Sequence, residues 1–168
     1  MLVAAVVFGG AYALPELSVV ERHTVIAASP DRVFAALDEL KDQSAWWDFS
    51  ACDPAVAFNF SGSFSGLGQK MDWSSADPLI GKGQAEVIAL EASKLVDLRV
   101  MGGIFKLADM RLAIAPVENG TGVTWTIRQP IPQLLQRWPR NVAAEQELSP
   151  GLVAGLERLK SQIEATNG

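Results

Sequence analysis

The chain offers few residues for nucleophilic chemistry. His23 is its only histidine and Cys52 its only cysteine, so a Ser-His-Asp or Cys-His arrangement would have to use one of them. Histidine can serve as a general acid or base, but His23 falls inside a predicted strand with no nucleophile beside it. Cys52 precedes Asp53 and lacks the electropositive neighbours that activate a thiol. We therefore predict a structural or surface role for His23, an inert Cys52 and no catalytic residue.

Metal ions, cofactors and nucleic acids are poor partners for this composition. One histidine and one cysteine cannot build the usual zinc sites, and no carboxylate cluster replaces them. The net charge is -5 and no basic stripe is present, whereas phosphate binding needs clustered Lys and Arg. The sequence thus predicts no metal, no cofactor and no nucleic acid partner.

The elements that position any site begin with a strand and a helix. Residues 19–28 are rich in β-branched side chains, which predicts a strand. Ser29 is a good N-cap, Pro30 suits the first helical position and Asp31 suits the positive end of the helix dipole. Apolar residues then recur at helical spacing up to Leu40. We predict a short amphipathic helix after the first strand.

The middle of the chain alternates apolar and polar residues and predicts six further strands. Their expected ranges are 55–60, 69–74, 84–92, 95–101, 105–115 and 121–128. Asn119-Gly120 predicts a hairpin turn between the last two. Charged residues take the positions opposite the apolar set, so we expect them on the solvated outer face, in cross-strand pairs. They are Asp72, Asp97, Arg99, Asp109 and Arg111.

The C-terminal region predicts the longest helix. Ser149-Pro150 repeats the start signal of the first helix, and an apolar stripe runs from Leu152 through Leu156 to Ile163. Consecutive strands flanked by helices indicate an α+β fold rather than a parallel α/β fold. A curved antiparallel sheet of about seven strands around one long helix leaves space between them, which is the default position for a pocket.

Inward-facing apolar residues are the predicted lining of that pocket, although ordinary core packing is the alternative for each. The set is Phe58, Phe60, Met71, Trp73, Val87, Leu98, Leu112, Trp125 and Leu156. Ala85 and Ala89 are small where larger residues would fill space. Trp46, Trp47 and Phe49 could gate the pocket or touch a membrane, but we favour a local cluster under the first helix.

Several short runs occur together in a recognisable order. They are Val25–Pro30 with Val33-Phe34, Trp46-Trp47 before Asp53-Pro54, Gly68 with Trp73, Gly81–Gly83, Gly120–Trp125 and Gly155–Lys160. Through these runs, residues 19–164 resemble the START-like, or SRPBCC, superfamily and its polyketide cyclase/dehydrase-like branch. The resemblance implies the helix-grip fold, in which a seven-stranded antiparallel sheet grips the C-terminal helix around an apolar cavity. It also implies binding of lipids, polyketides or similar molecules, with catalysis in some members but no shared catalytic residues.

The first 14 residues carry no charge and form a separate apolar arm, whereas residues 15–168 are expected to form one START-like domain. The arm is too short to span a bilayer, which needs about 20 apolar residues. It is a remnant of a signal or membrane anchor, a weak signal peptide, or an ordered apolar arm. The first interpretation agrees with relatives that carry such a segment. It predicts a place in the cell envelope and membrane association through the arm.

Three functions remain open. The leading hypothesis is a noncatalytic domain that binds a small hydrophobic molecule such as a lipid or polyketide. The second is a cyclase or dehydrase acting on a bound hydrophobic substrate, which requires an ionisable side chain inside the cavity. The third is a protein-interaction module, which predicts a filled interior and an exposed apolar patch.

Overall fold

The computed structural model describes residues 16–47, 49–131 and 137–166. The elements in chain order are β1 (Leu17–Ile26), α2 (Pro30–Leu37), α3 (Leu40–Trp46), α4 (Phe49–Cys52), β2 (Ala57–Gly62), β3 (Gln69–Ser74), β4 (Lys82–Glu91), β5 (Leu95–Gly102), the 3-10 turn η1 (Gly103–Phe105), β6 (Lys106–Val117), β7 (Gly120–Pro130) and α5 (Arg137–Ala165). No helix within these ranges is long and apolar enough to cross a membrane. The apolar arm, residues 1–14, lies outside the described residues.

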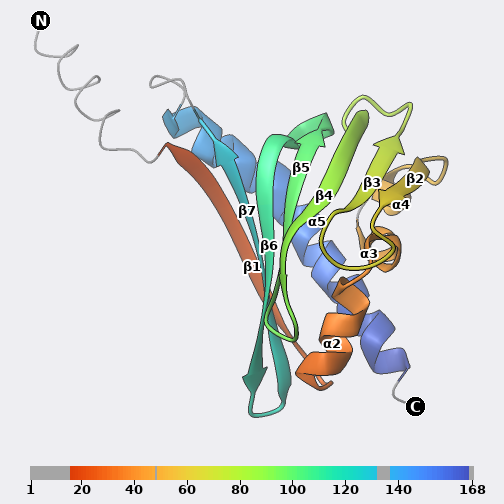
Figure 1. Ribbon diagram of the computed structural model, residues 1–168. Helices are drawn as coiled ribbons and strands as arrows, with labels where there is room; N and C mark the ends of the chain where they lie inside the picture. The colour runs from red at the N-terminus through yellow and green to blue at the C-terminus, as the bar shows by residue number, and fades with distance from the viewer. Residues whose placement is uncertain (1–15, 48, 132–136, 167–168) are drawn as a thin grey trace, which may run out of the picture.

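The seven strands form one curved antiparallel sheet in the order β1-β7-β6-β5-β4-β3-β2 (Figure 1). The first strand therefore pairs with the last, and the remaining strands follow as hairpins. The predicted turn at Asn119-Gly120 joins β6 to β7, with Val117 paired to Gly120. These features confirm the predicted helix-grip fold.

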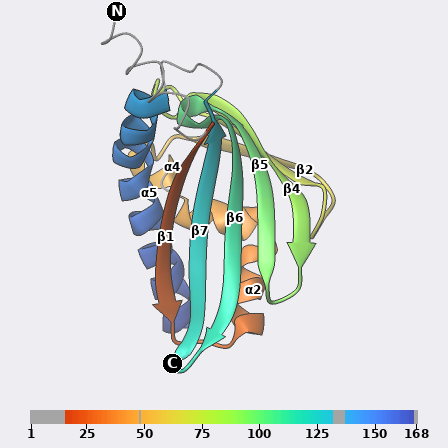
Figure 2. The same cartoon turned by 90° about the vertical axis from the view of Figure 1, so that its left-hand side faces the viewer.

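All described helices lie on one side of the sheet, and α5 runs beside β1 (Figure 2). Side chains join this helix to the edge strand along most of its length. Near one end of the contact, Arg22 of β1 donates hydrogen bonds to Glu145 and to Ser149 Oγ. Near the other end, Lys160 donates to the Val25 carbonyl at 2.9 Å and Glu164 accepts from the Ala27 N–H at 2.8 Å. The helix thereby covers an edge whose backbone would otherwise be open on that side.

The start of α5 differs from the prediction. The helix begins at Arg137, and Ser149-Pro150 lies inside it instead of at its N-terminus. Ala144 and Leu148 are buried and continue the stripe of Leu152 and Leu156 toward the N-terminus. Packing of this longer face outweighs the lost backbone hydrogen bond at Pro150. The Ser149 hydroxyl accepts a hydrogen bond from Arg22.

The outer face of the sheet carries the predicted charge pairs. The Arg111 guanidinium lies 2.6 Å from Asp97, and the Arg99 guanidinium lies 3.1 Å from Asp109. Both pairs connect β5 with β6, where these residues are directly opposite each other. The prediction of cross-strand pairs on a solvated face is confirmed for these four residues.

A bulge in β4 corrects the predicted orientation of Ala89. The register shifts between Val87 and Ala89, so Ala89 lies opposite Asp97, whose carboxylate pairs with Arg111 on the outer face. Leu90 lies opposite the buried Val96 and packs against the core instead. One extra residue reverses the faces of everything beyond it. The prediction that Ala89 faces inward is therefore wrong, whereas Ala85 and Val87 are buried as expected.

Two buried glutamines fix the corner between α2 and α3. Gln69 of β3 accepts a hydrogen bond from the Leu40 N–H at 3.1 Å and donates to the Asp38 carbonyl at 2.6 Å. Gln43 donates to the Leu37 carbonyl at 2.6 Å. These bonds satisfy backbone groups at the end of one helix and the start of the next. They hold α3 against the sheet, and α3 leads directly to the aromatic residues of the site.

Candidate functional site

A cavity of about 620 Å³ lies between the sheet and the N-terminal half of α5. We call it the main cavity. Trp125 and Ile127 of β7 line it from the sheet, and the opposite wall comes from α5. The remaining wall comes from the α3–α4 region, the β3–β4 connection and the end of η1. The full lining is Trp47, Phe49, Cys52, Asp77, Leu79, Ile80, Phe105, Lys106, Trp125, Ile127, Arg140, Glu147, Leu148, Pro150, Gly151 and Leu152.

An aromatic cluster forms much of this wall, with Phe49 at its centre. Its ring centroid lies 5.5 Å from that of Trp47, 5.9 Å from that of Phe105 and 4.9 Å from that of Trp73. Trp47 and Phe49 are 2% and 6% exposed. Edge-to-face and tilted contacts of this kind stabilise a fixed arrangement of rings. None of these side chains is exposed for contact with a membrane.

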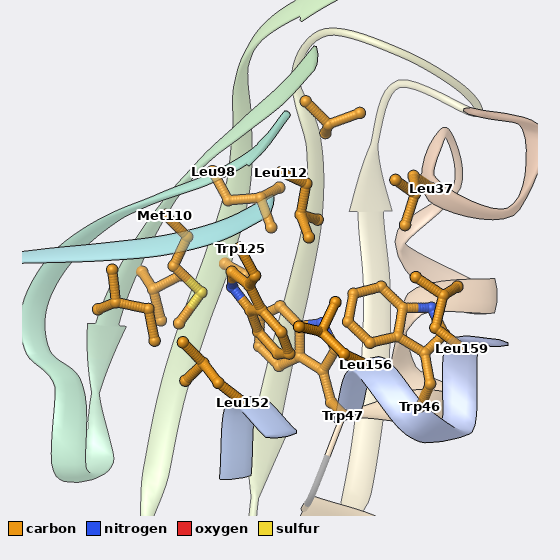
Figure 3. Packing of buried hydrophobic residues seen from close by; sticks show 14 of the residues in the cluster. Leu37, Trp46, Trp47, Leu98, Met110, Leu112, Trp125, Leu152, Leu156 and Leu159 are labelled. Carbon is orange, nitrogen blue, oxygen red and sulfur yellow. The ribbon is translucent and has the colours of Figure 1, made fainter. Parts of the chain in front are cut away.

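Trp125 crosses the space between the sheet and α5 (Figure 3). Its ring meets that of Trp46 edge to face, with centroids 5.2 Å apart and planes at 84°. A close approach of α5 is possible because residue 155 is glycine. A methyl group at that position would lie 2.7 Å from Cζ3 of Trp125. Arg158 of the same helix donates to the Trp46 carbonyl at 3.1 Å, so both tryptophans are held by α5.

Trp73 lies behind the aromatic wall and supports it. Its indole N–H donates to the Ile80 carbonyl at 3.2 Å. Its ring covers Gly83 on β4, where a methyl group would lie 2.1 Å from Cζ2. Trp73 contacts both Trp47 and Phe49 through its ring. It therefore positions two lining residues without lining the main cavity itself.

Charged residues gather at one end of the main cavity. Lys106, Arg140 and Glu147 also line a smaller cavity of about 340 Å³, which adjoins the main one at Phe105. No carboxylate of the described residues lies within 4.0 Å of Lys106 or Arg140. Lys106 has φ of 53°, a conformation that is strained for a residue with a side chain. This end of the cavity thus presents two cations that have no ion-pair partner in the described chain.

A hydrogen-bonded turn holds another part of the wall. The Asp53 carboxylate accepts hydrogen bonds from the Ser75 hydroxyl and from the Ala55 N–H. These two bonds hold the pKa of Asp53 below its ordinary value. Ser75 Oγ accepts from the Asp77 N–H at 2.9 Å, and Asp77 accepts from the Leu79 N–H at 2.8 Å. The end of α4 is thereby joined to the β3–β4 connection that carries Leu79 and Ile80.

The structure separates the nine residues predicted to line a pocket. Trp125 lines the main cavity. The others have three different placements. Met71, Val87, Leu98, Leu112 and Leu156 are fully buried in the core, Trp73 supports the aromatic wall, and Phe58 and Phe60 stack on each other on the edge strand β2. Phe60 is 41% exposed.

Several lining residues were missed because they lie before the predicted helix start. Arg140, Glu147 and Leu148 belong to the part of α5 that precedes Ser149-Pro150. Together with Gly151 and Leu152 they recur at helical spacing on one face. The spacing of Ala144, Leu148 and Leu152 was the available signal, since it extends the apolar stripe by two turns. Phe105 and Lys106 gave no comparable signal.

The chemistry open to this site is mainly apolar recognition. Within the described ranges no three His, Cys, Asp or Glu side chains come together as metal ligands. His23 is exposed on β1 and does not line either cavity. The ionisable side chains that line the main cavity are those of Cys52, Asp77, Lys106, Arg140 and Glu147.

Residues 18–164 match the model of a family described as polyketide cyclase/dehydrase and lipid transport. No curated protein sequence matches the chain. Solved structures share its fold at low identity. Norcoclaurine synthase from Thalictrum flavum, in complex with dopamine and hydroxybenzaldehyde, has a TM-score of 0.67 at 10% identity, covering 92% of this chain and 90% of its own.

Two proteins of unestablished function are similar in the same way. One from Staphylococcus aureus has a TM-score of 0.71 at 14% identity and covers 90% of this chain and 96% of its own. One from Rhizobium leguminosarum has a TM-score of 0.64 at 15% identity and covers 89% and 96%. At these identities the likeness establishes the fold.

Proposed function

Because the chain belongs to the polyketide cyclase/dehydrase and lipid transport family, we propose that it binds a small hydrophobic molecule in the main cavity without transforming it. The family is associated with ligands of this class. The observation that carries the proposal is a cavity of about 620 Å³ with a largely apolar and aromatic wall. Pockets for small molecules typically measure about 300–1,000 Å³ and have this kind of lining.

The ligand contacts in this proposal come from the aromatic wall and α5. Trp125 is retained from the nine residues predicted to line a pocket. Trp47, Phe49, Phe105 and Leu152 are added because they line the same space. Norcoclaurine synthase, which shares the fold, is known in complex with two aromatic molecules. That likeness supports an aromatic ligand.

Catalysis is the second candidate function, and one observation favours it. Cys52, Asp77, Lys106 and Glu147 bring ionisable groups to the cavity wall, as a cyclase or dehydrase would require. Lys106 and Glu147 are exposed, however. The wall also contains no histidine. Binding without turnover therefore remains the better-supported function. A protein-interaction module would be expected to have a filled interior. The presence of the main cavity therefore gives that hypothesis less support.

Native mass spectrometry of the full chain tests the proposal. The protein is purified, sprayed directly, and then mixed with a panel of fatty acids, flat aromatic ketones and polycyclic hydrocarbons. We expect at least one panel member or a co-purified molecule to remain bound at one copy per chain, with unchanged mass after incubation. A chain that retains nothing and shows no thermal shift with any panel member would refute binding. A changed ligand mass would support the enzyme instead.

A further inference from the structure

Exposed apolar side chains gather at the end of the sheet where the cavities lie. Single exposed apolar residues are normal on a protein surface, but five lie at this one end. Met101 of β5 and Leu107 of β6 are directly opposite each other and are 43% and 46% exposed. Leu17 of β1 is opposite the exposed Pro130 of β7, and Leu79, on the β3–β4 connection, is 70% exposed. We call these five residues the apolar rim.

Contacts between the elements place the rim residues at the same end of the molecule. Leu107 and Pro130 both line the smaller cavity. The β3–β4 connection reaches them, since a methyl group on Gly103, directly after β5, would lie 2.4 Å from the Ile80 carbonyl oxygen. The start of β1, the end of β5 and the start of β6 lie at this end of the sheet, and the β6–β7 turn lies at the other (Figures 1 and 2).

The apolar arm joins the domain at the rim. Residues 1–14 carry no charge, and Leu17, a rim residue, is the first residue of β1. The Glu16 carbonyl accepts a hydrogen bond from the Ile131 N–H at 2.7 Å, which holds the chain to the sheet at this point. An uncharged segment and a group of exposed apolar side chains therefore share one end of the molecule. Apolar surface of both kinds is stabilised by leaving water for a lipid bilayer.

Basic side chains flank the rim. Lys106 begins β6, and Arg128 lies in the next row of the sheet. Neither forms an ion pair within the described ranges. Long basic side chains can extend along apolar surface and keep their charge near lipid phosphates. The carboxylates of Asp77 and Glu147 lie at the same end, so apolar contact must supply most of the affinity of this surface.

We propose that the apolar rim lies against the surface of a phospholipid bilayer into which the apolar arm inserts. The arm tethers the domain, and the rim fixes its orientation, so the β6–β7 turn points away from the bilayer. A tether raises the effective concentration of the rim at the lipid surface, so a weak apolar contact is enough to hold it there. The inference requires no ligand in the main cavity and is therefore independent of the proposed function.

Site-specific fluorescence on vesicles tests this orientation. Cys52, the only cysteine, is replaced with serine, and Met101→Cys or Val117→Cys then carries an environment-sensitive dye. Both positions are 43% exposed, but Met101 pairs with the start of β6, whereas Val117 is the last residue of that strand. The full chain is mixed with phosphatidylcholine–phosphatidylglycerol vesicles that contain lipids with a nitroxide on the acyl chain. We expect the emission from position 101 to shift to shorter wavelength and to be quenched, and the emission from position 117 to stay as in water.

Serine substitutions measure what the rim contributes to the affinity. Met101→Ser combined with Leu107→Ser should weaken the partitioning of the full chain onto vesicles by at least about fivefold, because two apolar side chains no longer leave water. Val25→Ser combined with Val117→Ser is the matched control, since these side chains are 42% and 43% exposed at the other end of the sheet. The control should bind like the unmodified chain.

The outcomes distinguish the rim from other contacts. Equal quenching at both positions, or unchanged partitioning of the double variant in the rim, overturns the inference and leaves the arm as the membrane contact. Absence of vesicle binding overturns it as well. A shift at position 101 that needs no vesicles and grows with protein concentration would assign the rim to a second copy of the chain. If the serine variants do not fold, the dye-labelled chains decide. Ligand retention, measured separately by native mass spectrometry, is unaffected by any of these results.

Discussion

Gly155 and Trp125 are in direct contact, and the absence of a side chain on Gly155 is what allows it. A methyl group at position 155 would lie 2.7 Å from Cζ3 and 3.4 Å from Cη2 of the Trp125 ring. The backbone carbonyl of Trp46 would lie 3.3 Å away on another side. The contact sets how closely α5 approaches β7, and the main cavity lies just beyond it along the helix.

Gly155→Ala should destabilise the protein by about 1–3 kcal/mol, because overpacking displaces a large ring in the core. Urea unfolding followed by circular dichroism measures the change. Gly151→Ala is the control, since Gly151 lies one turn earlier on α5 and lines the cavity. There the gain in helix propensity, up to about 1 kcal/mol, should make the variant neutral or more stable. Equal stability of Gly155→Ala and the unmodified chain would contradict the packing argument.

Gly151→Leu should abolish ligand binding while the fold is kept. The new side chain starts from the cavity wall and occupies the space that a ligand needs. We expect the affinity for 9-fluorenone, a flat aromatic ketone that serves as the probe, to fall by at least about tenfold, which corresponds to ~1.4 kcal/mol. Equilibrium dialysis and a thermal melt give the two readouts. Val153→Leu, at an exposed position of the same helix, is the control and should change neither the affinity nor the melting temperature. Unaltered affinity in Gly151→Leu would show that the ligand binds elsewhere.

Lys106 and Arg140 should favour acidic ligands over neutral ones. Replacing both with glutamine should weaken the binding of fluorene-9-carboxylate by about two- to thirtyfold, since charges near the surface contribute about 0.2–1 kcal/mol each. Fluorene itself should be unaffected. Glu147→Gln should act in the opposite direction, because it removes a negative charge from the same end of the cavity. The differences should shrink at high salt. Dialysis at two ionic strengths checks this, and a salt-independent result would rule out a role for these charges.

Asp53 should make the protein more stable above the ordinary pKa of aspartate than below it. Its pKa is lowered in the folded chain by the Ser75 and Ala55 hydrogen bonds. A lowered carboxyl pKa contributes stability that is present above the unfolded-state pKa and is lost as the pH falls through the folded-state pKa. Ser75→Ala should raise the Asp53 pKa and reduce the stability that the protein loses at low pH. Carbon-detected NMR titration of the Asp53 carboxyl group measures its pKa in the unmodified chain and in Ser75→Ala. An unchanged pKa in the variant would show that the Ser75 hydrogen bond does not lower it.

The Asp97–Arg111 pair should stabilise the sheet modestly. Both guanidinium–carboxylate hydrogen bonds are short, at 2.6 and 2.7 Å, but the Arg111 side chain is 44% exposed. A double-mutant cycle with Asp97→Ala and Arg111→Ala should give a coupling free energy of about 0.2–1 kcal/mol that decreases with salt. A coupling above 2 kcal/mol would indicate a network wider than this pair.

Alternation along the strands predicted the strands and the outer-face charge pairs, and the order of strands and helices predicted the α+β class. The helix-grip fold itself was implied by the resemblance to the START-like superfamily. Alternation assigned Leu98 and Leu112 to the inner face correctly, since both are buried. It could not separate them from Trp125 and Ile127, which line the cavity. Periodicity predicts on which face of the sheet a side chain lies. Whether that side chain lines a cavity depends on the distance between the sheet and the helix that faces it.

Local signals also failed where tertiary packing opposed them. Ser149-Pro150 has the composition of a helix start, yet the helix continues through it because Ala144 and Leu148 pack on the core. The bulge after Val87 falls in the apolar run Val87–Leu90, where apolar and polar residues no longer alternate, and Ala89 was assigned to the wrong face as a result. At Ser149-Pro150, contacts distant in sequence decided the local conformation.

The pairing of β1 with β7 has a consequence for how the chain is made. During translation β1 leaves the ribosome before the other six described strands, but β7, the strand with which it pairs, is the last of the seven to appear. The α5 side chains that hold its other side emerge later still. Until then β1 has unpaired backbone groups and apolar side chains, a state prone to association with other chains. Final closure of the sheet must therefore follow synthesis of β7, and such long-range pairing is intrinsically slow.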